Sequence, residues 1–177
     1  MNSLVVYESM FGNTKAIAHA IVEGLSSQMS TQIEEVGAAA DQVGAEVDLL
    51  VVGAPTHAFS MSRPKTRQSA AAQAHGELVS KGVGLREWLT AVQIKGTPIA
   101  AGFDTRIDKP RLPGSAAKAA GKFLRRRGLG LVAPAESFYV VGTDGPLLDG
   151  ELERARRWGE VLASACANTS KAGAEPA

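Results

Sequence analysis

The chain has 177 residues, of which 45% are apolar and 21% are charged, and its formal net charge is +1. This length fits one domain with a full hydrophobic core. No stretch approaches the roughly 18 apolar residues of a membrane span, and the N-terminus lacks the basic region and cleavage site of a signal peptide. The single cysteine, Cys166, excludes a disulfide framework and a cysteine-based metal site. We therefore expect a cytoplasmic protein without a membrane partner.

The charges are unevenly distributed along the chain. Residues 16–62 include six acidic residues and no lysine or arginine, whereas residues 104–127 include eight basic and two acidic residues. This pattern predicts a dipolar molecule. Nucleic-acid binding would need stacking aromatics among the basic residues, and aromatics make up only 5% of the chain, so no nucleic-acid partner is expected. The three histidines, His19, His57 and His75, lack the spacing of metal ligands.

Apolar runs and helical periodicity predict alternating strands and helices. In chain order we expect a strand at 4–7, a helix at 13–25, a strand at 33–36, a short weak helix at 38–43 and a strand at 47–53. Then come one or two helices within 65–93, including 85–89, a strand at 98–103, a helix at 115–127, a fifth strand within 130–141 and a last helix at 146–165. We expect one domain over residues 1–167 and a mobile tail over 168–177.

Strands that alternate with helices predict an α/β fold, with a parallel sheet covered by helices on both faces. Ligands of such sheets bind beyond the carboxyl ends of the strands, where the strand order changes direction. The loops after the first, third and fourth expected strands are therefore the candidate binding loops.

The first of these loops has the features of a phosphate cradle. It runs from the end of the first strand into the first helix, and a helix N-terminus offers unpaired backbone N–H groups and partial positive charge. Ser9, Asn13 and Thr14 add neutral donors, Gly12 permits close backbone approach, and Lys15 is the only nearby cation. The alternative is a capped strand–helix turn without a ligand. The loop lacks the Gly-Lys-Ser/Thr ending of a nucleotide P-loop and the Gly-x-Gly-x-x-Gly dinucleotide pattern.

Residues 5–18 resemble the FMN-phosphate signature of flavodoxins. An apolar pair and an aromatic residue precede a Ser/Thr, then Gly-x-Thr and an Ala, and Ser9, Gly12, Thr14 and Ala18 fall in register. Phe11 stands where that family often has Thr, so one hydroxyl is missing. The resemblance implies a three-layer sandwich with a five-stranded parallel sheet of order 2-1-3-4-5. It also implies noncovalent FMN, with its phosphate held by Ser9, Met10, Phe11, Gly12, Asn13 and Thr14.

The resemblance extends to the loop after the third strand, Gly-Ala-Pro-Thr, which is similar to the turn that flanks the flavin ring. It implies that Pro55, Thr56, His57 and Phe59 contact the ring, with Phe59 or His57 stacked on it. A core position for Phe59 and a surface position for His57 are the alternatives.

The loop after the fourth strand departs from the flavodoxin pattern. That family usually has an acidic loop with a stacking Tyr, whereas this chain has Phe103, Asp104 and Arg106, followed by Lys109 and Arg111. We expect the first three to contact the cofactor. Cations near the ring would stabilise an anionic reduced flavin and raise its potential. Arg106 could instead meet an acidic partner, or lie exposed to solvent.

Three functions fit these residues. The first is an FMN-dependent electron carrier that works with a redox partner protein, a reductase or an acceptor, and needs no catalytic side chain. The second is an FMN-dependent NAD(P)H or quinone oxidoreductase, in which His57 or Arg106 would orient substrate. The third is a flavin-free module that retains the fold. The oligomeric state stays open.

Overall fold

A five-stranded parallel sheet forms the centre of the molecule in the computed structural model, which describes residues 1–74, 76–109 and 113–172. Its strands lie in the order β2-β1-β4-β6-β7, which confirms the expected topology. Their bounds are β1 Asn2–Tyr7, β2 Ser30–Glu35, β4 Leu49–Pro55, β6 Ile99–Ile107 and β7 Glu136–Val140. The order reverses between β1 and β4, so these two strands flank the switch point where ligands of such sheets bind.

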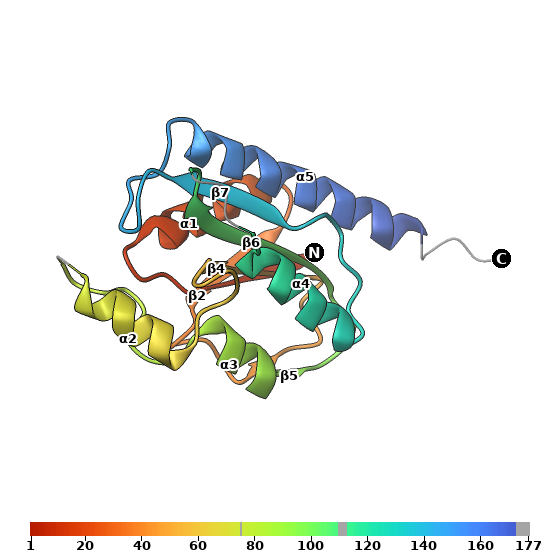
Figure 1. Ribbon diagram of the computed structural model, residues 1–177. Coiled ribbons are helices and arrows are strands. Elements are labelled where there is room, and N and C mark those ends of the chain that lie inside the picture. The colour runs from red at the N-terminus through yellow and green to blue at the C-terminus, as the bar shows by residue number, and fades with distance from the viewer. Residues whose placement is uncertain (75, 110–112, 173–177) are drawn as a thin grey trace.

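Helices cover both faces of this sheet (Figure 1). One face carries α1 and α5, and the other carries α3 and α4. The helix bounds are α1 Asn13–Leu25, α2 Pro64–Ala72, α3 Leu85–Ala91, α4 Ala116–Arg126 and α5 Glu151–Ala172. Because side chains alternate along a strand, Val5 and Val51 pack under α1 and α5, while Val6 and Val52 pack under α3 and α4.

Helices α1 and α5 approach each other at two glycines. A Cβ on Gly24 would lie 2.0 Å from the carbonyl oxygen of Arg156, and one on Gly159 would lie 2.3 Å from that of Ile21. Backbone contacts this close exclude any larger side chain at either position. The helix that carries the candidate phosphate cradle is therefore packed directly on the backbone of the last helix.

The prediction of a short helix at 38–43 is wrong. The chain turns after β2 and then forms β3, Gln42–Val43, which pairs in parallel with β5, Gln93–Ile94. Val43 is buried in the core beside α3. Pairing with a strand distant in sequence therefore overrides the local alanine-rich composition. The segment 65–93 contains two helices, α2 and α3, as the sequence allows.

Strand β6 and helix α5 continue past the ends that the sequence predicts. Strand β6 continues through Ile107, so residues 104–107 belong to the strand and not to a loop. Helix α5 begins at Glu151 and continues through Ala172, past the expected start of the tail at residue 168. Residues 173–177 of that tail lie outside the described residues. No helix within the described ranges has the length and apolar character needed to cross a bilayer.

Candidate functional site

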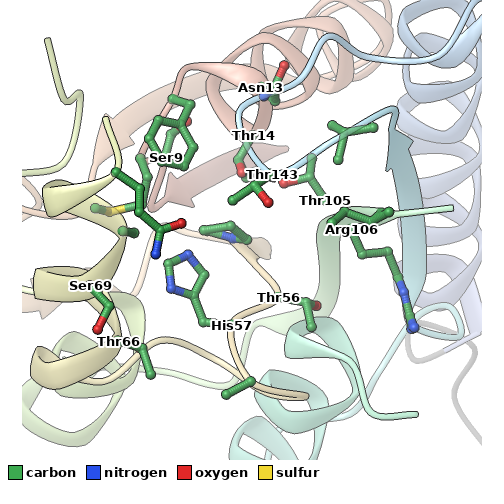
Figure 2. Close-up of a pocket in the computed structure, with 18 residues that line it drawn as sticks. Ser9, Asn13, Thr14, Thr56, His57, Thr66, Ser69, Thr105, Arg106 and Thr143 are labelled. Carbon is green, nitrogen blue, oxygen red and sulfur yellow. Dashed lines mark hydrogen bonds between the residues drawn. The ribbon is translucent and has the colours of Figure 1, made fainter. Parts of the chain in front are cut away.

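A cavity of about 310 Å³ opens at the carboxyl edge of the sheet. The loops after β1 and β4, the end of β6 and helix α2 form its walls (Figure 2). Of the expected site residues, it is lined by Ser9, Met10, Phe11, Asn13, Thr14, Pro55, Thr56, His57 and Arg106. The candidate cofactor residues of three distant segments are thus brought together.

Unpaired backbone donors form the floor of the cradle. The N–H groups of Met10, Phe11, Asn13 and Thr14 have no hydrogen-bond acceptor among the described residues. They lie at the head of α1, where the helix dipole adds partial positive charge. Gly12 has φ 92°, a left-handed conformation that a glycine adopts without strain. The floor can therefore accept an anion through neutral groups alone.

The Ser9 hydroxyl shapes this cradle from below. It is fully buried, and its Oγ accepts hydrogen bonds from the N–H groups of Gly12 at 3.1 Å and Lys15 at 3.2 Å. Both acceptor positions are thereby used, and the hydroxyl proton is left to donate. Ser9 thus stabilises the loop, and its hydroxyl proton remains available for a ligand.

A buried pair of threonines forms the next part of the site. Thr14 Oγ1 lies 2.7 Å from Thr105 Oγ1. Two hydroxyls that share one hydrogen bond keep one further proton, which can donate to a ligand. Thr105 is not among the expected site residues, because the sequence predicts that the fourth strand ends at residue 103. The alternation of β6 would have found it, since Thr105 faces the same side as Phe103, towards α1.

Of the expected cofactor residues that do not line the cavity, Phe103 and Asp104 are buried on opposite faces of the sheet. Phe103 is fully buried in the core, with its ring edge-on to Phe138 and Trp158. Asp104 is also fully buried and points to the opposite face, where its Oδ2 accepts from the Thr56 hydroxyl at 2.9 Å and the Ala117 N–H at 3.0 Å. The expected contact of both residues with the cofactor is wrong for the same reason: β6 continues past them, so strand alternation fixes their directions.

Asp104 therefore serves the site indirectly. Its Oδ2 also accepts from the Ser115 hydroxyl, the N-cap of α4. Thr56 in turn accepts from the Ala116 N–H at 2.9 Å. The carboxylate thus ties the loop after β4 to the start of α4, and it holds Thr56 at the cavity wall.

The loop after β4 closes with a strained turn. His57 and Ser60 exchange two backbone hydrogen bonds, and the two residues between them, Ala58 and Phe59, have φ 43° and 71°. Both values lie in the left-handed region, which non-glycine residues seldom occupy. The Phe59 side chain is 53% exposed and lines a smaller hollow beside the main cavity, so it lies neither in the core nor in the main cavity.

His57 faces the cavity, and Figure 2 shows its imidazole pointing towards the centre of the pocket. It is half-buried, and this burial lowers the pKa of the imidazole from its ordinary value of 6.5. The side chain is therefore neutral at pH 7. A neutral imidazole can both donate and accept a hydrogen bond within the cavity.

Arg106 lies at the outer rim. Its Nη1 donates to the Gly114 carbonyl oxygen at 2.6 Å, and in Figure 2 its guanidinium points away from His57. Lys109 is exposed, and Arg111 lies outside the described residues. Of the cations expected near the ring, Arg106 is the one that lines the cavity within the described part of the chain, and it lies at the rim.

Helix α2 forms a wall of the cavity, although none of its residues is among the expected cofactor contacts. Thr66 and Ser69 of this helix, and Gln73 directly after it, line the cavity. The segment after α2 is attached to the cradle through Ser80, whose N–H donates to the Ser9 carbonyl oxygen at 2.7 Å and whose Oγ accepts from the Ser9 N–H at 2.9 Å. Only the polar character of α2 could have suggested this position, because its packing depends on contacts distant in sequence.

Comparison with solved structures identifies this architecture. A flavodoxin from the domain Archaea is similar over 94% of this chain and 99% of its own, with a TM-score of 0.63 and 20% identity. Oxidised flavodoxin 1 from Bacillus cereus is similar over 93% and 98%, with a TM-score of 0.66 and 16% identity. The chain has a flavodoxin-like fold. This confirms the fold that the opening motif indicates.

A protein described as a flavone reductase shares the flavodoxin-like fold, with a TM-score of 0.59 and 11% identity, over 96% of this chain and 64% of its own. No protein-family model matches the sequence, and no curated protein matches it. At these identities the likeness concerns the fold, and function must be argued from the site.

Proposed function

We propose that this flavodoxin-like chain binds FMN without a covalent bond and acts in electron transfer. The observation that carries the proposal is the cradle at the head of α1, where unpaired backbone N–H groups and the Ser9 hydroxyl converge. Such a site suits a phosphate ester, because it supplies several donors and a favourable dipole without a fixed positive charge.

The remainder of the cavity suits the rest of the cofactor. Beyond the cradle, the lining is mostly neutral, with Pro55, Ile107 and Val140 among the apolar residues. When bound, FMN would supply the electron-transfer chemistry. Thr14 and Thr105 would donate to the phosphate side, and the loop 55–58 would hold the ring through backbone groups and Thr56.

The titratable side chains argue for a carrier. Among the described residues that line the cavity, only His57 and Arg106 have titratable side chains. A site of this kind offers no pair of carboxylates and no nucleophile with an adjacent base. The cofactor would therefore act without acid–base help from the cradle.

An NAD(P)H or quinone oxidoreductase is the second candidate, and the position of His57 favours it. A neutral imidazole that faces the cavity could orient a small substrate over the ring, with α2 as the opposite wall. The cradle does not distinguish this candidate from a carrier, since both would bind FMN there.

Flavin binding is the decisive test. Titration of the purified protein with FMN should quench flavin fluorescence at a one-to-one ratio, and a protein that neither purifies with flavin nor takes up added FMN would refute the proposal. If FMN binds, rapid oxidation of NADH or NADPH with a quinone, in the absence of a reductase, would favour the second candidate. Slow turnover without a reductase would favour the carrier.

A further inference from the structure

Helix α4 presents a purely cationic surface to solvent. Its apolar side, which includes Ala117, Ala120 and Leu124, is buried against the sheet. Every exposed side chain of the helix is a lysine or an arginine, namely Lys118, Lys122, Arg125 and Arg126. We call these four residues the basic α4 face.

Stability of the helix does not account for this face. None of the four side chains forms an ion pair within the described part of the chain. Arg125 and Arg126 lie in the last turn, where the helix dipole favours cations, but Lys118 lies in the first turn, where the dipole disfavours one. On α5, by contrast, Arg154, Arg156 and Arg157 are all paired with glutamates.

The basic α4 face begins at the rim of the cavity. Ser115, the N-cap of α4, shares Asp104 with Thr56 of the cavity wall. The adjacent Gly114 accepts a hydrogen bond from Arg106 and lies against the backbone of Phe59, because a Cβ on this glycine would be 2.1 Å from the Phe59 carbonyl oxygen. The exposed Phe59 ring and the first lysine of α4 therefore flank the same edge of the site.

We propose that the basic α4 face, together with Phe59, is the docking surface for an acidic protein. The inference rests on the proposed function, because that protein would be the redox partner of the carrier. An unpaired basic surface that starts beside the cavity and continues along α4 would attract an acidic partner and orient it towards the cofactor.

A protein partner fits this surface better than a nucleic acid or a membrane. Nucleic-acid surfaces combine cations with several aromatic side chains on which successive bases stack, whereas this surface has one exposed aromatic residue, Phe59, and none on the exposed side of α4. A membrane-surface helix buries its apolar side in lipid, whereas that side of α4 is packed in the core.

The test uses fluorescent poly-L-glutamate as the acidic probe and the full chain with and without FMN. We expect binding at low salt that weakens as salt rises. Lys122→Glu should weaken binding roughly three- to tenfold, as expected for reversal of one exposed charge, and Lys118→Glu with Lys122→Glu should weaken it further. The matched control is Arg157→Glu on α5, which changes the net charge equally and should leave binding unchanged. Thermal unfolding verifies that each variant is folded.

Each outcome decides the inference. Absence of poly-L-glutamate binding at low salt would overturn it. So would a loss of affinity in Arg157→Glu as large as that in Lys122→Glu. Tighter binding of single-stranded oligo-dT of matched charge would overturn it in favour of a nucleic acid. If the protein binds poly-L-glutamate through the basic α4 face but takes up no FMN, the docking surface is supported and the proposed function is refuted. The two proposals can therefore fail separately.

Discussion

Removal of two hydroxyls from the cradle should separate FMN from riboflavin. The change is Ser9→Ala combined with Thr14→Val, which preserves the size of both side chains to within a few atoms. Ser9 has a proton left to donate, and the pair of Thr14 and Thr105 keeps one more. Only FMN has the phosphate that these groups would meet, so riboflavin should be bound almost as before.

The magnitude follows from the hydrogen bonds that are lost. A hydrogen bond to a charged acceptor contributes about 1.5–3 kcal/mol, and some of this is regained from water and from the backbone donors that remain. We therefore expect a loss of about 2–3 kcal/mol for the double variant, which is roughly a 30- to 150-fold rise in the Kd for FMN. The Kd for riboflavin should change by less than about threefold.

Fluorescence titration with both flavins measures these constants. Thr31→Val is the matched control, because it removes a hydroxyl that bonds to Ser3 in the sheet, far from the cavity. The apoprotein of the double variant should also lose about 1–2 kcal/mol of unfolding free energy, since the Gly12 and Lys15 N–H groups lose their acceptor. Equal weakening of FMN and riboflavin would show that the phosphate does not lie in this cradle.

Three further predictions concern the framework of the site. Ala58→Gly should raise the unfolding free energy by about 0.5–1 kcal/mol, because glycine adopts the left-handed conformation of this residue without strain. A lower unfolding free energy of the variant in urea denaturation would show that Ala58 is not strained. Gly24→Ala should cost about 3 kcal/mol or more through its clash with the α5 backbone, whereas Gly82→Ala, with nothing within 4 Å, should change little; similar losses for both would refute the close helix contact. Burial raises the pKa of the Glu8 carboxyl above its ordinary 4.5, so the folded chain binds the proton more tightly. The stability of the wild type relative to Glu8→Gln should therefore fall as pH rises from 4.5 through the folded-state pKa, and a pH-independent difference would exclude this origin.

The opening motif and the strand pattern predict the fold and the place of the loop after β1 because both depend on local sequence. Strand–helix alternation determines the parallel sheet, and Ser9 to Thr14 stand next to one another in the chain. The sequence predicts the end of β6 too early because Asp104 and Arg106 are polar, which is typical of a loop. The length of a strand depends on its neighbours, and β7 pairs with β6 as far as Ile107.

The position of α2 beside the cavity could not be predicted from the sequence. Thr66 and Gln73 carry no pattern that predicts their position, since nothing in the local sequence specifies where a polar helix packs. Their place follows from the bonds of Ser80 to Ser9 across the fold, which only a three-dimensional structure shows. Periodicity identifies the helix, and long-range contacts position it.

The Ser80 side chain joins three parts of the chain at one buried point. Its hydroxyl accepts from the Ser9 N–H and donates to Glu35 Oε1 at the end of β2, at 2.5 Å. The loop after β1 is therefore held in shape before any ligand arrives, and binding need not pay the entropy of ordering it. A preorganised receptor of this kind should combine with its ligand in a single fast phase, with a rate that rises linearly with ligand concentration and without a slow rearrangement afterwards.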